Sequence, residues 1–381
     1  MIDTQLILFE GLPSTGKTTN ARIINIQLER AGFDVQWIHE VAMPQPVLFF
    51  DEVAFTYDEY NEFTEMHLKA KETLDKIAVF KKSTIGIHLP QIQWNYTDKI
   101  GDDVFQALLK YDAWTFPLEK YKHFALEKWE HFTENALKTK NKIYIIDSAL
   151  FQFQIFTFLF QNKPFEELQN FVDQIINNIK PLNPCLIYLH RENPDITIDY
   201  LENDRGTSYL EYIWNRDKHQ PYYEDKPPGA ESFKQFLREY SKMADLLFKS
   251  FPAKKLSLDI SKENWIEHEK DMLAFIDIDH TPNPEATLQT GVYTNESLNF
   301  TIKVEGLTMK DPTGQVRKLI PKSSNEFYID WLPTILCFEK NKLIINGSQV
   351  CEHWTKTGLE YNKVNVKQGD GSSACHETEN I

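Results

Sequence analysis

The sequence predicts an α/β domain built on a parallel sheet, followed by a small all-β domain. Over most of the chain, short apolar runs alternate with helix-length amphipathic segments, a pattern typical of βαβ units. After about residue 291 only short alternating runs remain. The length of 381 residues also exceeds one typical domain of roughly 150 residues. We therefore expect one large domain and a smaller one.

The first βαβ unit occupies the N-terminal segment. Residues 5–9 form an apolar burst and predict a strand, and residues 17–31 carry apolar side chains every three or four positions, as a helix does. Gly32 stands where a helix-ending glycine belongs. Residues 35–38 return to strand composition. Two strands and a connecting helix are predicted here.

The middle of the chain predicts further helices and strands of the same domain. Amphipathic patterns predict helices at residues 58–82, 116–138, 166–179, 231–250 and 264–275. Short apolar runs predict strands at residues 142–146, 185–189 and 255–258. We assign residues 1–276 to this domain and leave the order of its strands open.

A linker and a second domain follow. Residues 277–291 lose periodicity and gather prolines and turn formers, so they predict a linker. Residues 292–366 predict a small β domain, with a type I turn at Asp311-Pro312-Thr313-Gly314. Its strands are expected at residues 299–304, 316–320, 326–329, 335–338 and 343–345. Residues 367–381, polar and rich in Gly and Ser, predict a disordered tail.

The strongest motif is GLPSTGKT at residues 11–18, which matches GxxxxGK[ST] between a predicted strand and a predicted helix. Glycines let such a loop point its N–H groups at phosphate oxygens, and the helix start adds partial positive charge. Lys17 would neutralise phosphates, and the Thr18 hydroxyl would ligate Mg²⁺. The predicted ATP-binding residues are Gly11, Pro13, Ser14, Thr15, Gly16, Lys17, Thr18 and Thr19.

Phosphoryl transfer also needs an acid near the metal and a group that takes the proton of the acceptor. Two carboxylates follow predicted strands, where ligands bind in open α/β sheets. Asp147 is expected to hold Mg²⁺ together with Thr18, with a helix-capping role as the alternative. Glu40 is expected to accept the proton, and the alternative is a solvated loop carboxylate.

Arginines after the fourth strand are candidates for a lid over the transferring phosphate. Arg205 precedes Gly206 in a predicted polar turn, and Arg216 lies on a predicted helix at residues 209–218. A guanidinium suits this task because it stays charged and binds phosphate oxygens with two nitrogens. Arg191 is a third candidate. The alternative for each is a solvated surface arginine.

The motif and the strand-end acids resemble the kinase division of P-loop proteins, nearest to the deoxynucleoside and thymidylate kinase-like group. The resemblance covers about residues 5–276 and rests on WIHE with Glu40, YIIDSALF with Asp147 and Ser148, and IYLHREN followed by LEYIWNRDKHQ. It implies a P-loop three-layer sandwich with a helical insertion. The deoxynucleoside kinases usually place an Arg between the acid and the Ser, whereas Ser148 follows Asp147 directly.

The β domain resembles the small β-module appended to some β-lactamase-like serine hydrolases, through residues 325–345 and the preceding DPTG turn. No SxxK motif occurs within residues 277–381. We expect contact with a protein partner or with a second copy of the chain, because exposed strand edges can pair.

Composition narrows the classes of partner. Lys and Arg number 41 against 56 Asp and Glu, a formal net charge of −15, which disfavours nucleic acids and anionic membrane surfaces. No apolar stretch approaches the roughly 20 residues of a membrane span. The four cysteines are dispersed and are expected to be reduced. A cytoplasmic location is expected.

The sequence thus predicts an Mg-ATP-dependent phosphotransferase for a small-molecule acceptor, either nucleoside-like or a hydroxyl of an antibiotic or metabolite. The alternative is a nucleotide-binding switch that hydrolyses ATP or GTP slowly and signals through the β domain. Against a GTPase, no NKxD motif follows the candidate strands, because Asn141-Lys142 continues with Ile143-Tyr144.

Overall fold

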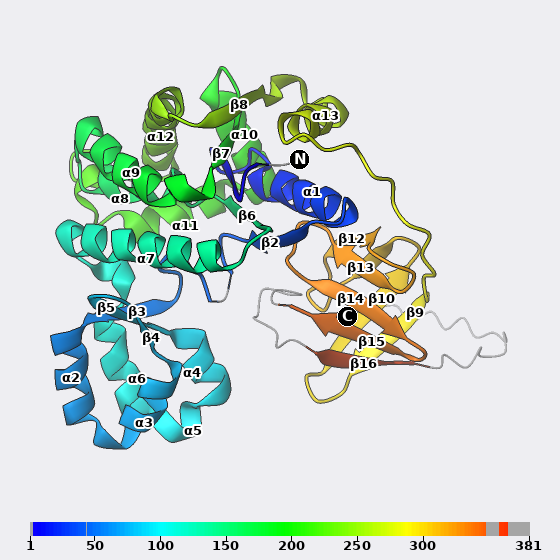
Figure 1. Ribbon diagram of the computed structural model, residues 1–381, viewed down its shortest axis with the longest axis horizontal. Coiled ribbons are helices and arrows are strands. Elements are labelled where there is room, and N and C mark those ends of the chain that lie inside the picture. Colours follow the sequence, from blue (N-terminus) through cyan, green and yellow to red (C-terminus); the bar gives the residue numbers. More distant parts are fainter. Residues whose placement is uncertain (1–2, 43, 348–357, 365–381) are drawn as a thin grey trace, which may run out of the picture. The chain divides into compact units, whose positions relative to one another are not determined.

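The computed structural model describes residues 3–42, 44–347 and 358–364 (Figure 1). The chain divides into two compact units, Met1–Thr281 and Pro282–Ile381. The predicted linker, residues 277–291, spans this division. The predicted tail, residues 367–381, lies outside the described residues.

The first unit is built on a parallel sheet of five strands, in the order β2-β6-β1-β7-β8. The strands are β1 (Leu6–Gly11), β2 (Asp34–Ile38), β6 (Lys142–Asp147), β7 (Cys185–His190) and β8 (Lys254–Asp259). All five predicted strands are confirmed, and the backbone pairing supplies the order that the sequence does not predict.

Helices cover both faces of this sheet (Figure 1). Successive side chains of β1 point to opposite faces, and because they are apolar on both, each face is buried under helices. Ile7 and Phe9 pack in a core with α1 (Lys17–Arg30) and α13 (Trp265–Phe275). Leu8 packs in the larger core on the other face. That core includes α7 (Leu118–Lys138), α8 (Gln152–Phe160), α9 (Phe165–Ile179) and α12 (Ala230–Ser250).

The chain order creates a switch point in the middle of the sheet. From β1 the chain crosses to β2 on one side, whereas from β7 it continues to β8 on the other. Ligands of open α/β sheets bind in the crevice outside the carboxyl ends of the strands at such a point. Gly11, which ends β1, therefore lies where a ligand is expected.

An insertion between β2 and β6 has its own hydrophobic core and its own small antiparallel sheet, in the order β3-β5-β4 (Figure 1). Its strands are β3 (Glu52–Thr56), β4 (Val79–Phe80) and β5 (Thr84–His88). Its helices are α2 (Tyr57–Met66), α3 (Leu68–Ile77), α4 (Leu89–Asn95), α5 (Thr97–Ile100) and α6 (Asp102–Leu108).

The prediction of a single helix at residues 58–82 was wrong. The helix breaks at His67, and the chain then enters the hairpin of β4 and β5. Phe55, Ile85 and Ile87 are fully buried against the insertion helices, so packing selects a strand there. The insertion predicted as helical is therefore a mixed α/β subdomain.

The second unit is a closed β-barrel in the order β10-β11-β12-β13-β14-β15-β16-β9. Its strands are β9 (Gly291–Asn295), β10 (Phe300–Glu305), β11 (Thr308–Lys310), β12 (Val316–Pro321), β13 (Glu326–Ile329), β14 (Ile335–Glu339), β15 (Lys342–Asn346) and β16 (Leu359–Lys363). The five predicted strands are confirmed. The sequence patterns missed β9, β11 and β16.

Two features of this unit bear on the predictions. The turn at Asp311 is confirmed, since the Gly314 N–H donates to the Asp311 carbonyl at 2.9 Å. The expectation of exposed strand edges was wrong, because β16 pairs with β9 and closes the described sheet. The described strands of the barrel therefore offer no free edge to a partner strand.

Within the described residues, no helix combines the length and the apolar character needed to cross a bilayer. Cys185 and Cys337 are free thiols, as predicted, whereas Cys351 and Cys375 lie outside the described part of the chain.

Candidate functional site

The loop at residues 11–18, here called the glycine loop, joins β1 to α1. Ser14 and Gly16 are left-handed, with φ of 65° and 85°, so consecutive peptide groups change direction within the loop. A Cβ at Gly11 would lie 2.3 Å from the Leu189 carbonyl oxygen of β7. Glycine is required there because the two backbones approach so closely.

The side chain of Lys17 folds back over the glycine loop. Its ammonium donates to the carbonyl oxygens of Gly11 at 3.0 Å and Leu12 at 2.9 Å. Burial lowers the pKa of Lys17, and the carboxylates of Glu40, Glu10 and Asp147 act in the opposite direction. This buried cation therefore lies beside the loop and is surrounded by three acids.

The start of α1 has no side chain capping it. The residue before the helix is Gly16, which has no side chain to accept hydrogen bonds from the N–H groups of the first turn. The Asn20 amide instead donates to the Gly16 carbonyl at 2.9 Å. Backbone N–H groups at such a helix start attract anions, and the helix dipole adds to the attraction.

Asp147 ends β6 and is fully buried. The Thr18 hydroxyl donates to its Oδ2 at 2.6 Å, and the indole N–H of Trp37 donates to its Oδ1 at 3.3 Å. Ser148 follows with φ of 63°, and its hydroxyl is buried with no hydrogen-bond partner among the described residues. The two residues predicted to hold Mg²⁺, Thr18 and Asp147, are thus brought into direct contact.

Glu40 follows β2 and faces the same site. Its Oε1 accepts a hydrogen bond from the Gln152 amide at 2.9 Å. Burial raises the pKa of Glu40 to about 7, with Lys17 opposing the shift and Asp147 adding to it. His39 beside it is buried, burial lowers its pKa, and its Nδ1 accepts the Val41 N–H at 3.1 Å.

Glu10 is a buried acid that sequence reasoning missed. It is the penultimate residue of β1, LILFEG, directly before the glycine loop, and it is fully buried. Its carboxylate accepts the N–H groups of Leu150 at 2.6 Å, Phe151 at 2.9 Å and Gln152 at 3.3 Å. Burial raises its pKa to about 7 despite these bonds. An acid inside an otherwise apolar strand was the signal available in the sequence.

The two lid candidates differ. Arg205 is the last residue of α10 (Pro194–Arg205), not part of a turn as predicted. Its guanidinium donates to the Tyr209 hydroxyl at 2.9 Å, and its charge acts on both Lys17 and Glu40. Arg216, near the end of α11 (Thr207–Asp217), donates two hydrogen bonds to Asp217, at 2.7 and 2.6 Å. The structure pairs Arg216 with its neighbour, whereas the charge of Arg205 acts on two residues of the site.

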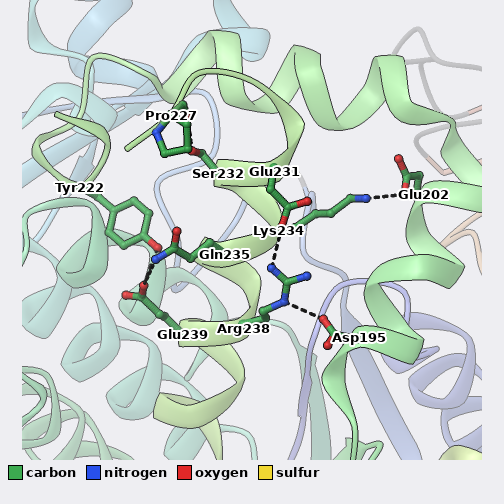
Figure 2. Close-up of polar contacts among 10 residues, drawn as sticks. All are labelled: Asp195, Glu202, Tyr222, Pro227, Glu231, Ser232, Lys234, Gln235, Arg238 and Glu239. Carbon is green, nitrogen blue, oxygen red and sulfur yellow. Dashed lines mark hydrogen bonds and ion pairs between the residues drawn. The ribbon is translucent and has the colours of Figure 1, made fainter. Parts of the chain in front are cut away.

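Ion pairs hold α10 against α12 (Figure 2). Arg238 of α12 lies between Asp195, at 2.7 Å, and Glu231, at 2.9 Å. One helical turn earlier, Lys234 pairs with Glu202 of α10 at 2.6 Å. These pairs are partly exposed, so each contributes little to the free energy of unfolding. Their main effect is to fix the orientation of α10 relative to α12.

A tryptophan missed by sequence reasoning flanks the glycine loop. The Trp265 ring lies 3.4 Å from the position of a Cβ at Gly16, and 39% of Trp265 is exposed. Two residues before Trp265, Glu263 pairs at 2.8 Å with the buried Arg191 after β7, which also donates to the Thr197 hydroxyl at 3.1 Å. The third lid candidate therefore anchors the chain beside Trp265.

The fold thus gathers most of the predicted site at the carboxyl edge of the sheet. Pro13 and Thr15 lie in the glycine loop, and Thr19 is exposed on the first turn of α1. Their roles in binding stay predictions. In comparisons with known proteins, no family model matches the chain and no curated protein is similar to it in sequence.

Proposed function

We propose that the first unit is a P-loop kinase domain that transfers a phosphoryl group from Mg-ATP to a small-molecule acceptor. The observation that carries the proposal is the glycine loop at the switch point of the sheet. Two left-handed residues, the buried Lys17 cation and the uncapped start of α1 converge there. This arrangement suits a polyphosphate, which needs N–H donors and positive charge at close range.

The residues present fit magnesium bound together with a nucleotide. Thr18 and Asp147 are in contact and would hold the ion, while phosphate oxygens and water would complete its shell. The described residues contain no group of three or more His, Cys, Asp or Glu side chains suited to a metal. A site with one carboxylate and one hydroxyl depends on the nucleotide for its other ligands. Bound Mg²⁺ would neutralise charge on the phosphates.

Glu40 is the residue that we assign to the proton of the acceptor. A proton acceptor works best when its pKa lies near the working pH, and burial raises the pKa of Glu40 to about 7. Lys17 and Arg205 both act on Glu40 electrostatically, and both would supply positive charge to the transferring phosphate. The ring of Trp265, beside the glycine loop, would stack on a nucleotide base.

The proposal is tested by calorimetry with Mg-ATP and Mg-GTP on the unmodified protein and on K17M and D147N. We expect K17M to lose at least tenfold in affinity for Mg-ATP, because the cation beside the phosphates is gone. D147N should bind the nucleotide but lose its dependence on Mg²⁺. Circular dichroism checks that both variants are folded.

The acceptor is sought by measuring ADP release with pools of small hydroxyl-bearing metabolites. A kinase should release ADP faster when its acceptor is present. If ADP release responded only to a protein and no metabolite became phosphorylated, the protein would be a nucleotide-dependent switch. Absence of binding heat with both nucleotides, together with unchanged behaviour of K17M, would overturn the proposal.

A further inference from the structure

The turn between β6 and α8 connects the two sides of the proposed active site. Helix α8 begins without a cap of its own, since Phe151 makes no side-chain cap and the first turn contains no acid. The N–H groups at a helix start need acceptors when they are buried. Glu10, which lies on another strand, supplies the acceptor for three consecutive N–H groups.

The same turn also holds Glu40. Gln152, the first residue of α8, gives its backbone N–H to Glu10 and its side-chain amide to Glu40. Gln152 thus contacts both Glu10, which precedes the glycine loop, and Glu40, the proposed proton acceptor. The neighbouring Gln154 points elsewhere, donating to the Ala149 carbonyl and accepting the Tyr121 hydroxyl.

We propose that Glu10 and Gln152 are positioning residues that hold the Glu40 carboxylate beside the glycine loop. The inference rests on the proposed function, because it gives Glu40 the task of proton acceptor. Glu10 is bonded in the chain to Gly11, the first residue of the glycine loop, and its hydrogen bonds hold the turn that carries Gln152.

The charged groups that face Glu40 come from three other elements. They are Lys17 of α1, Asp147 of β6 and Arg205 of α10, and the Gln152 hydrogen bond favours the ionised carboxylate. Loss of that hydrogen bond alone should make Glu40 harder to ionise. This shift can be measured without knowing the acceptor.

The test follows the titration of Glu40 by carbon-13 NMR on protein labelled at glutamate carboxyl groups, with the signal identified by its loss in E40Q. In Q152M we expect the midpoint to rise by about half a pH unit or more. Q154M is the matched control, because it removes a glutamine of the same helix that does not touch Glu40. It should lower the melting temperature and leave the midpoint unchanged.

Glu10 is tested through E10Q and the double variant. E10Q should speed hydrogen exchange at the amides of residues 150–152 and also raise the midpoint of Glu40. Because Glu10 acts through Gln152, the double variant E10Q/Q152M should shift the midpoint no further than Q152M alone. Shifts that add, or an unchanged midpoint in Q152M, would overturn the inference.

Activity gives a second measurement. With Mg-ATP as the probe, Q152M should keep its affinity within about twofold and lose about threefold in ADP release near pH 6.5, as a rise of about half a pH unit in the Glu40 midpoint predicts. The rate should recover near pH 8.5, where Glu40 is again ionised, which a purely structural defect would not do. If the unmodified protein failed to bind Mg-ATP, the proposed function would fall, whereas the NMR shifts would still decide the positioning.

Discussion

Glu10 and Glu40 are acids whose ionisation is opposed by burial. In the folded protein, burial raises the pKa of each from the ordinary 4.5 to about 7. For such a group the unfolded chain loses its proton first as pH rises, while the folded chain retains it. Each acid therefore weakens folding progressively between pH 4.5 and 7, by up to about 1.4 kcal/mol per pH unit. At neutral pH these two acids of the site therefore lower the free energy of unfolding.

E40Q should accordingly be more stable than the unmodified protein at pH 8, by about 1–3 kcal/mol, and nearly equal to it at pH 5. The amide imitates the protonated acid and cannot ionise. Urea unfolding at both pH values measures the difference. E224Q, at an exposed position, is the control and should show no such dependence. An equal difference at both pH values would contradict the assignment of the raised pKa to Glu40.

Among the elements, the connection from β1 to α1 is the most constrained. Its first residue, Gly11, combines φ of 149° with close contact to β7 and to the Thr15 hydroxyl. Gly32, beyond the other end of α1, has φ of 87°, but no atom lies within 4 Å of the point that a Cβ would occupy. A side chain at Gly32 would meet only the cost of the left-handed backbone. A side chain at Gly11 would in addition collide with neighbouring atoms.

G32A should therefore lower the free energy of unfolding by only about 1 kcal/mol, the cost of a left-handed alanine. G11A should cost on the order of 3 kcal/mol or more and weaken Mg-ATP binding, because the loop must move away from Leu189. Urea unfolding and calorimetry provide the two measurements. Equal costs at both positions would refute the claim of close approach at Gly11.

The insertion contacts α7 through charge as well as apolar packing. Lys128 of α7 pairs with Glu52 of β3, both buried, and burial lowers the pKa of Lys128 to about 8. Burial lowers the pKa of Lys81, and the Glu52 carboxylate opposes that shift. A buried pair of this kind fixes the orientation of packed elements more than it adds stability.

K128M should destabilise the protein by on the order of 3 kcal/mol, because Glu52 loses its partner while still buried. The double variant K128M/E52Q should recover much of that loss. K71M is the control, since Lys71 and Asp75 form an exposed pair whose removal should cost under about 1 kcal/mol. The measurement is urea unfolding of all variants. Failure of E52Q to rescue K128M would show that Lys128 acts by packing alone.

At the scale of the whole molecule, the two units have separate hydrophobic cores. Every residue of the candidate site belongs to the first unit, Met1–Thr281. The barrel fills its interior with its own apolar side chains and closes its described sheet.

A chain truncated after Thr281 should therefore fold and bind Mg-ATP within about threefold of the full-length affinity. Circular dichroism and calorimetry on both chains make the comparison. Loss of binding in a folded truncated chain would show that the barrel contributes to the nucleotide site.

The sequence by itself determined the features that depend on neighbours along the chain. Apolar periodicity predicted the five parallel strands and most of their helices, and the glycine loop was visible as a motif. Glu40 and Asp147 were found because they follow strands, and the carboxyl ends of parallel strands share one edge. Each of these inferences needs only local pattern and one general rule of topology.

Only the tertiary structure decided the strand order, the hairpin of the insertion and the closure of the barrel, because each depends on pairing between distant segments. The same reason explains the missed site residues. Glu10 matters through amides about 140 residues away, and Trp265 lies beside Gly16 from the other end of the unit. Arg216 and Arg205 looked alike in sequence, and only their folded partners distinguish them.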